Sequence, residues 1–267
     1  MKKISFKMKS IFSLFLVGML AFSMAGCGNT ASEKQEDAAA SSSENKASAE
    51  NVTSDVSVSA MLGESPEWVT KLSDAAKSDQ LFVVAVYENT TAWISLHEKD
   101  NAGKWQMIMS TPGFVGKAGL GKTKEGDAKT PVGTFHFNAA FGIADDPGCA
   151  IPYTKVDDNT YWSGDQKEGM HYNEMVDIKD YPDLDVENSE HIVDYTRQYQ
   201  YCLNIDYNKE GKPGLGSAIF LHCFGPYKPY TGGCVAIPEN QMKFVMQHVS
   251  PDCTVVIDTL DNLGGEF

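Results

Sequence analysis

The sequence predicts a mostly β domain with a few helices, preceded by a segment that stays outside the fold. Three observations support this prediction. Runs rich in Val, Ile, Phe, Tyr and Trp outnumber the helical patterns. No strand–helix alternation and no internal repeat occurs along the chain. From position 27 to about position 64 large apolar side chains are almost absent, so these residues cannot bury enough surface to fold.

The first 26 residues have the layout of a secretory signal peptide. Four lysines precede an apolar run over residues 11–24, which is too short to span a membrane. The run ends in small residues followed by Cys27. This ending resembles the bacterial lipobox, where the cysteine after the cleavage point receives lipid, and an ordinary signal peptide with an incidental cysteine is the alternative. Residues 27–64 are then the lipidated cysteine and a disordered tether.

This start predicts an exported lipoprotein, held at the outer face of the cytoplasmic membrane by its N-terminal lipid. Loss of residues 1–26 removes four lysines and no acids, so the net charge of −14 becomes −18. That charge disfavours nucleic acid as a partner. It suits general solubility, and it would also attract a cationic substrate. About 200 residues remain for one folded domain, which is enough for a sizeable core.

The folded domain is expected to open with one short amphipathic helix within residues 65–80. Ser65 is a good helix cap, Pro66 suits the first helical position, and Glu67 suits the first turn. Apolar residues then recur on one helical face. This helix precedes the first strand.

Three strand-like runs follow and predict a β-meander. They cover residues 81–87, 91–96 and 105–110, with turn residues between them. A long glycine-rich loop then leads into a strand over residues 133–137. Residues 139–197 show no clear periodicity, and a segment of this length in a compact domain is typical of a lid or a binding wall.

The C-terminal part combines strands with one helix. Residues 199–207 and 217–223 are strand-like, and the second run is continuous enough for a buried central strand. A helix begins at Pro238, and its apolar residues recur at helical spacing until Pro251 follows its end. A last strand covers residues 253–257.

The cysteines give the first indication of a reactive thiol. An odd number in an exported chain leaves at least one thiol without an intrachain partner, and five follow Cys27: Cys149, Cys202, Cys223, Cys234 and Cys253. Three of them are expected to be structural, either as buried small residues or with one disulfide among them: Cys149, Cys202 and Cys253. No Cys-x2-Cys or His-x3-His pair is present, so no metal site is expected.

A histidine and a cysteine stand at the ends of two rigid elements. His222 ends a hydrophobic strand, and Cys234 follows two glycines twelve positions later. An imidazole near a thiol can take its proton and lower its pKa, which prepares the thiolate for attack. Gly232 and Gly233 allow a sharp turn that aims N–H groups at the oxygen of a tetrahedral intermediate, with the amide of Cys234 as the first candidate. We therefore predict Cys234 as nucleophile and His222 as base.

These residues resemble the hallmark of the YkuD-type L,D-transpeptidase family, in which a histidine is followed by a short loop and Ser/Thr-x-Gly-Cys. The matching positions here are His222, Thr231, Gly233 and Cys234. The glycine-rich residues 116–121 and the run from Lys-Glu-Gly-Asp to Thr-Pro-Val-Gly-Thr-Phe at positions 124–135 are also similar to that family. The resemblance covers about residues 81–258. It implies a mixed β-sandwich and makes residues 81–267 the catalytic domain.

The resemblance implies acyl transfer on peptidoglycan stem peptides without a cofactor. Cys234 would attack the carbonyl of the third residue and expel the terminal D-alanine. An amine acceptor would then give a cross-link, whereas water would give trimming, as in an L,D-carboxypeptidase. The backbones of Gly232, Gly233 and Cys223 are expected to support the oxyanion or the base. The expected substrate contacts are Thr231, Tyr230 and Tyr227.

Two other classes of function stay open at this stage. One is a non-catalytic wall-binding lipoprotein, and the other is a redox-sensing lipoprotein that uses Cys223 and Cys234. The role of Cys223 is equally open: a buried apolar residue, a backbone helper that orients His222, or a disulfide partner of Cys234. The family often has an arginine where this chain has Ala236, so the chain resembles a branch in which Gly-Cys-Val precedes a small residue and Pro-Glu.

Overall fold

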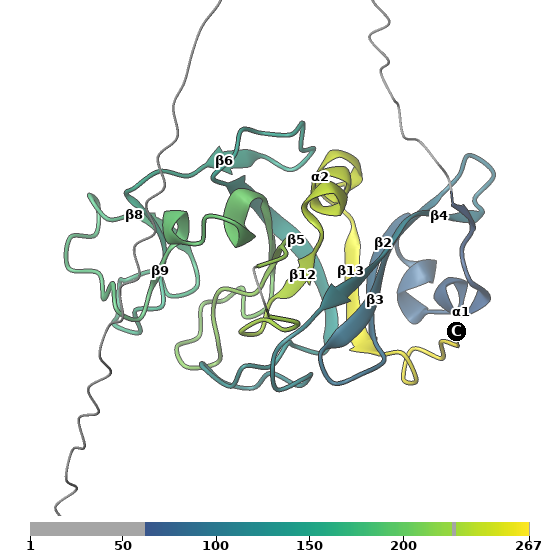
Figure 1. Cartoon of the computed structure of the whole chain (residues 1–267), viewed down its shortest axis with the longest axis horizontal. Helices are drawn as coiled ribbons and strands as arrows, with labels where there is room; N and C mark the ends of the chain where they lie inside the picture. The colour runs from purple at the N-terminus through teal and green to yellow at the C-terminus, as the bar shows by residue number, and fades with distance from the viewer. Residues whose placement is uncertain (1–61, 226–227, 267) are drawn as a thin grey trace, which may run out of the picture. The chain divides into compact units, whose positions relative to one another are not determined.

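The structure is a computed structural model that describes residues 62–225 and 228–266 (Figure 1). The predicted signal peptide, Cys27 and Tyr227 lie outside the described residues, as does most of the predicted tether. The last residues assigned to the tether are described, and two of them form strand β1 (Gly63–Glu64), which pairs with β4 (Trp105–Phe114).

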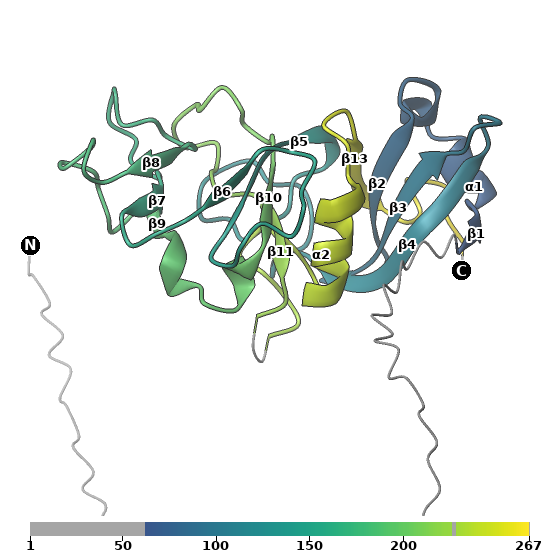
Figure 2. The ribbon, with the colours of Figure 1, turned by 90° about the horizontal axis from the view of Figure 1, so that it is seen from above.

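The centre of the domain is a mixed sheet of ten strands that closes on itself, counted within the described residues. Pairings run from β3 through β4, β12, β11, β10, β5, β13 and β2 back to β3 (Figures 1 and 2). Strand β1 and strand β6 (Tyr153–Lys155) extend it. The bounds of the other strands are β2 (Gln80–Val86), β3 (Thr91–Lys99), β5 (Gly133–Gly142), β10 (Cys202–Ile205), β11 (Phe220–Cys223), β12 (Val235–Ile237) and β13 (Thr254–Thr259).

The predicted fold class is confirmed, because strands dominate the domain. Strands β2, β3 and β4 form the predicted antiparallel meander. Most neighbours are antiparallel, but β11–β12, β13–β2 and β5–β6 are parallel, which makes the sheet mixed.

The closed sheet separates two environments, and β2 shows how the sequence specifies them. Phe82 and Val84 belong to the interior cluster, whereas Leu81 and Val83 face an outer layer. This alternation follows from the period of two along a strand. The outer layer contains α1 (Glu67–Thr70) and the 3-10 turn η1 (Ser73–Ala76).

The predicted N-terminal helix is only partly correct. It is divided into α1 and η1, because Leu72 has an extended backbone between them. Ser65 does not cap the helix. Its hydroxyl lies 2.8 Å from Nδ1 of His97, and Pro66 occupies the cap position without a side-chain bond. Nε2 of His97 lies 2.7 Å from the hydroxyl of Ser95, so the buried ring is satisfied on both sides.

The C-terminal helix α2 (Glu239–His248) agrees with its prediction. Its apolar face is completely buried against the interior cluster, at Met242, Val245 and Met246. The helix follows β12 directly and lies beside the sheet (Figure 2). Strand β11 is shorter than the predicted run over residues 217–223, because Ala218 adopts a left-handed conformation with φ of 54°.

The later part of the unassigned segment over residues 139–197 forms a second, smaller layer that we call the small sheet, whereas its first part contributes the end of β5 and strand β6 to the central sheet. The small sheet consists of β7 (Thr160–Trp162), β8 (Met175–Asp177) and β9 (Glu190–His191), in the order β8-β7-β9. Both views place it at the end of the domain away from β2 and β3 (Figures 1 and 2). An apolar cluster joins it to the central sheet through Phe141, Trp162 and Phe220. The short turns η2 (Ile192–Asp194) and η3 (Gln198–Gln200) lead back to β10.

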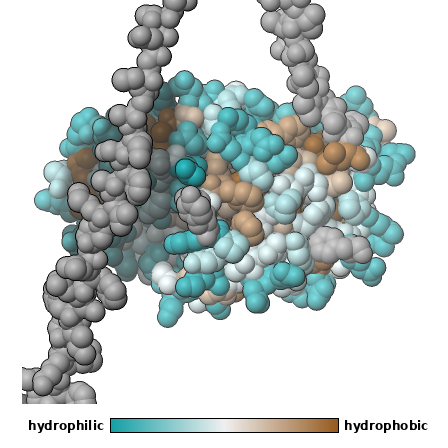
Figure 3. All heavy atoms as spheres, in the orientation of Figure 1, coloured by the Kyte–Doolittle hydropathy of each residue, from teal (hydrophilic) through white to brown (hydrophobic). Residues whose placement is uncertain are grey.

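Apolar residues on the surface appear as separate patches among hydrophilic ones (Figure 3). The large apolar side chains that are exposed are spread over the described chain, at Leu62, Tyr87, Val132, Val186 and Leu215. Within residues 62–225 and 228–266, no helix has the length and apolar character needed to cross a membrane.

We expect the domain to lose stability on acidification because of His97. Burial lowers the pKa of this imidazole to about 3, whereas an unfolded chain titrates near 6.5. Between these values the unfolded state binds a proton that the folded state does not. The free energy of unfolding should therefore fall as the pH drops from about 6.5 toward 3. Urea unfolding at a series of pH values measures this slope.

The substitution His97→Gln should reduce the slope, and His136→Gln, at an exposed position, is the matched control. Burial also lowers the pKa of His222, to about 4, so this residue contributes in the same direction. Equal slopes for the His97 and His136 variants would show that the buried ring is not the source.

Candidate active site

Two neighbouring strands position the predicted base and nucleophile. β11 and β12 run parallel, with His222 opposite Ala236. Cys234 immediately precedes β12 and joins Phe220 in the apolar cluster on the outer face of the sheet. His222 lies two residues from Phe220 and therefore shares that face. His222, Cys234 and Ala236 line one cavity of about 490 Å³.

The imidazole of His222 is fixed by its own neighbour in the chain. Nδ1 lies 2.7 Å from the carbonyl oxygen of Cys223. A carbonyl only accepts hydrogen bonds, so Nδ1 carries the proton and Nε2 keeps its lone pair. The ring of Tyr199 packs edge-on against the imidazole, with 5.5 Å between centroids. The backbone of Cys223 thus orients His222, which is one of the three roles predicted for this residue.

The side chain of Cys223 points away from the cavity. It is buried in the interior cluster, whereas Cys234 lies in the cluster on the outer face. The two thiols are therefore on opposite faces of the sheet, and a disulfide between them would require the sheet to rearrange. All five described cysteines are free.

The thiol of Cys234 is held between two backbone groups. It donates to the carbonyl oxygen of Ala218 over 3.1 Å and accepts from the N–H of Phe220 over 3.4 Å. Ala218 has positive φ, which is costly for a residue with a Cβ and is often found at functional sites. Its own N–H donates to Oδ1 of Asn173 over 3.0 Å. The strained residue therefore directs its carbonyl at the thiol.

Both reactive groups are neutral in the resting site. Burial raises the pKa of the Cys234 thiol to about 12, and the nearby Glu190 carboxylate acts in the same direction, while Phe220 and Lys122 oppose them. Burial lowers the pKa of His222 to about 4. The sequence predicted an imidazole that lowers the thiol pKa. In the resting structure desolvation outweighs any such effect, and the thiol bonds to Ala218 instead of to the imidazole.

The two glycines before Cys234 have different roles. Gly233 has φ of 147°, and a Cβ there would lie 2.9 Å from the carbonyl oxygen of Lys129, so only glycine fits. Gly232 has open space around it. The hydroxyl of Thr231 closes the turn, because it donates to the carbonyl of Cys234 over 2.6 Å and accepts from the N–H of Gly233 over 3.1 Å.

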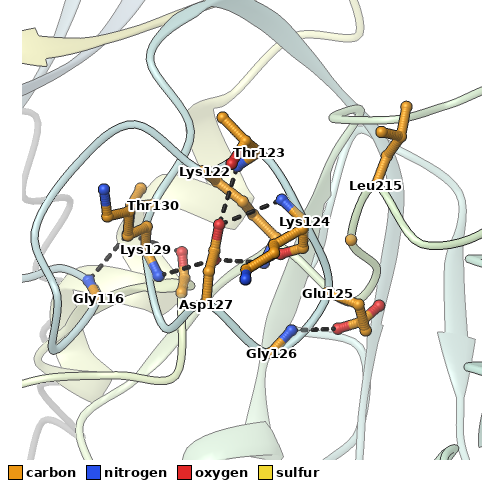
Figure 4. Close-up of polar contacts among 12 residues, drawn as sticks. Gly116, Lys122, Thr123, Lys124, Glu125, Gly126, Asp127, Lys129, Thr130 and Leu215 are labelled. Atoms are coloured by element: carbon orange, nitrogen blue, oxygen red, sulfur yellow. Dashed lines mark hydrogen bonds and ion pairs between the residues drawn. The ribbon is translucent and has the colours of Figure 1, made fainter.

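A buried hydroxyl ties this turn to the glycine-rich loop. Thr130 donates to the carbonyl of Gly233 over 2.7 Å. It also accepts from the N–H of Gly116 over 2.9 Å, as Figure 4 shows. Two backbone bonds add to it, from Lys117 to Thr231 and from Thr231 to Val115. The upstream glycine-rich motif, which resembles the family, therefore supports the turn at residues 231–234, called the nucleophile turn after the predicted role of Cys234.

The same loop contains a buried ion pair. Nζ of Lys122 lies 3.1 Å from Oδ1 of Asp127, and both side chains are almost fully buried. Asp127 also accepts N–H bonds from Thr123, Lys124 and Lys129, as Figure 4 shows. Burial alone would raise the pKa of Asp127, but these bonds hold it at about 2. The aliphatic stem of Lys122 fits against Gly216, where a Cβ would overlap its Cε.

Most of the predicted site residues come together around the cavity. Its lining includes His222, Tyr230, Thr231, Gly232, Gly233 and Cys234. Cys223 contributes its backbone alone, and Cys27 and Tyr227 lie outside the described residues. No group of three or more potential metal ligands is clustered in the described part of the chain.

Among the cavity residues that the sequence did not indicate are Lys122, Glu190 and Ala218, each of which acts on the Cys234 thiol. Lys122 stands in a run of charged residues that looks like an ordinary exposed loop. Glu190 belongs to the segment without periodicity. The left-handed conformation of Ala218 leaves no trace in the sequence, apart from the small residues around it.

The fold and the site together define a β domain with a buried Cys/His pair in one cavity. The model of the YkuD family, described as the L,D-transpeptidase catalytic domain, matches residues 83–257. The chain therefore belongs to this family.

Two solved structures show a partial similarity. One is the helical cell shape determining protein Pgp2 from Campylobacter jejuni, at 17% identity and a TM-score of 0.36, covering 72% of this chain and 54% of that chain. The other is a lysine-to-alanine variant of Pgp2, at 18% identity and a TM-score of 0.36, covering 72% and 53%. The chain spans about half the length of these proteins. The comparison with curated protein sequences gave no match.

Replacing Thr130 by valine should weaken the nucleophile turn. The change keeps the shape of the side chain but leaves the N–H of Gly116 and the carbonyl of Gly233 without their bonds. We expect a loss of about 1–3 kcal/mol in the free energy of unfolding, measured by urea denaturation. Thr134→Val, at an exposed position of β5, should change it by less than about 0.5 kcal/mol. Equal effects would show that the hydroxyl bridge is not stabilising.

Two glycines with similar backbone strain allow a test of the Lys122 packing. Gly216 and Gly214 have φ of 116° and 82°, so alanine is strained at both. Only at Gly216 would the new Cβ displace Lys122, since the nearest atom at Gly214 is 3.7 Å away on Gln166. We expect Gly216→Ala to lower the melting temperature clearly more than Gly214→Ala. The reverse order would contradict a packed Lys122.

Proposed function

We propose that the protein is a cysteine acyltransferase that acts on peptidoglycan stem peptides, with Cys234 as nucleophile and His222 as base. The observation that carries the proposal is the neutral His222, whose Nε2 has no hydrogen-bond partner among the described residues and which lies in the same cavity as the Cys234 thiol. A neutral imidazole can accept the thiol proton and return it to a leaving group. Family membership supports the choice of substrate polymer.

The acylation step follows from these positions. Nε2 of His222 takes the thiol proton while Sγ of Cys234 attacks the carbonyl carbon of the third stem residue. The tetrahedral intermediate collapses to a thioester, and the amine of the terminal D-alanine leaves with the proton from His222. An acceptor amine or water then attacks the thioester, gives its proton to Nε2 and restores the thiol. An amine produces a cross-link, and water produces a trimmed peptide.

The backbone of the nucleophile turn suits the oxyanion of that intermediate. The N–H of Gly233 is occupied by Thr231. Outside the strand ladders, the N–H of Cys234 donates to no described residue. It is therefore the donor that we assign to the oxyanion, and Gly233 is needed to give the turn its shape.

The place of action is part of the same proposal. The N-terminal sequence, with a signal-like run ending at Cys27, supports an exported lipoprotein whose domain works at the outer face of the cytoplasmic membrane. A stem peptide is accessible there, and an acceptor amine or water decides the product.

Intact-protein mass spectrometry tests the nucleophile. The full chain is incubated with a free tetrapeptide stem and, separately, with a carbapenem as acylating probe. We expect a covalent adduct or release of D-alanine, which Cys234→Ala abolishes. His222→Gln should slow acylation by about 10² or more. Cys149→Ala is the control, because Cys149 is the described cysteine with partial exposure.

The products separate the possible outcomes. A cross-linked dimer identifies a transpeptidase, and a tripeptide with free D-alanine identifies an L,D-carboxypeptidase. An adduct that persists in Cys234→Ala, or the absence of adduct and turnover with reduced thiols, would contradict the proposal. The second result would favour a wall-binding module.

A further inference from the structure

A carboxylate in the active-site cavity forms no ion pair with any described residue. Glu190 lies on β9 of the small sheet and lines the cavity together with Cys234. Its Oε2 accepts a hydrogen bond from the hydroxyl of Tyr199 over 2.6 Å. Its Oε1 has no donor among the described residues, and none of their lysine, arginine or histidine side chains forms an ion pair with it.

Two other charged side chains of the cavity are already engaged, whereas Lys117 and Lys228 also line it without forming an ion pair with Glu190. Lys122 is paired with Asp127. Glu125 accepts hydrogen bonds from the hydroxyls of Tyr172 and Ser217. Glu190 differs from Lys122 and Glu125, because its Oε1 can still accept a hydrogen bond from a ligand that enters the cavity. A carboxylate in such a place binds a cation or a hydrogen-bond donor.

Glu190 is also coupled to the reactive thiol. Its negative charge helps to raise the pKa of the Cys234 thiol, second only to burial. Its partner Tyr199 packs against the ring of His222. A positive group placed at Glu190 would cancel the charge that opposes the thiolate, so binding there would favour the attacking form of Cys234.

We propose that Glu190 is the specificity-determining residue of the cavity: it binds an ammonium group on the side chain of the substrate, and this binding prepares Cys234 for attack. The proposal rests on the proposed function for the identity of the substrate, a stem peptide whose third residue carries a free amine. The empty site keeps its nucleophile protonated, and the substrate supplies the charge that activates it.

The protonation of Glu190 sets the pH range of this effect. Burial raises the pKa of Glu190 to about 7, and the charge of Glu125 adds to this, while the Tyr199 bond opposes it. Ammonium recognition should therefore weaken as the pH falls through about 7, because Glu190 becomes neutral. The titratable groups that interact with it come from several elements: Glu125, Tyr195, Tyr199, Cys202 and Cys234.

Charged thiol reagents measure the recognition without any turnover. The full chain is treated with a cationic reagent, 2-aminoethyl methanethiosulfonate, and with neutral methyl methanethiosulfonate. Peptide mass spectrometry then gives the rate of modification at Cys234 alone. Both reagents react with the Cys234 thiolate, so both rates are proportional to the fraction of Cys234 that is ionised. The ratio of the two rates does not depend on this fraction and reports the charge around the thiol.

We expect the cationic reagent to be preferred at pH 8 and the preference to fall roughly three- to tenfold in Glu190→Gln. Glu168→Gln, an exposed glutamate of the same segment, is the matched control and should keep the wild-type ratio. In the wild type the ratio should also fall between pH 8 and pH 6. This titration uses the wild type alone, so it tests cation binding by Glu190 even if Glu190→Gln fails to fold.

A Glu190→Gln variant with an unchanged ratio, or a flat wild-type ratio across pH 7, would overturn the proposal.

A second experiment compares a stem tetrapeptide that has a free side-chain amine with the same peptide acetylated at that amine. The wild type should prefer the free amine in kcat/KM, and Glu190→Gln should lose this preference while it still turns over the acetylated peptide. Equal turnover of both peptides by the wild type also overturns it. No turnover of either peptide refutes the proposed function, whereas the reagent ratio still decides whether Glu190 binds cations.

Discussion

The site depends on the parallel pairing of β11 with β12. This register places His222 beside the small Ala236 and brings the N–H of Phe220 to the sulfur of Cys234. Two residues 12 positions apart in sequence thus share one face of a rigid sheet. A shift of one residue in this pairing would turn Cys234 into the interior, because faces alternate along a strand. The hydroxyl bridge of Thr130 and the buried α2 keep the register from either side of β12.

The sequence predicted the central sheet well because its strands carry their own signal. In β2 a continuous run of apolar residues indicates a strand that is buried on both faces. In α2 the helical spacing of the apolar residues indicates which side is buried. The local patterns also pointed to His222 and Cys234, which lie in one cavity, since one follows a strand and the other follows two glycines. Only the structure distinguishes Gly233, which is sterically required, from Gly232, which is not.

The remaining parts of the site depend on contacts between distant segments. The strands of the small sheet are two or three residues long, too short to show a period, and they are held by aromatic packing on Phe141 and Phe220. Ser65 was predicted to cap a helix, but a histidine 32 positions away competes for its hydroxyl. Glu190 becomes significant only when the small sheet places it in the same cavity as Cys234. These are tertiary effects that no local pattern encodes.

The protonated state of the buried Cys234 thiol also affects its resistance to oxidation. Peroxides and other oxidants attack the thiolate, and they convert it to sulfenic acid and then to irreversible products. A cysteine that stays a neutral thiol behind Ala218 and Phe220 is a poor target for them, and its neighbour Cys223 is shielded in the core. Under the proposed function, Cys234 would resist oxidation while the cavity is empty, because the thiolate would form only while a bound substrate blocks the approach of the oxidant.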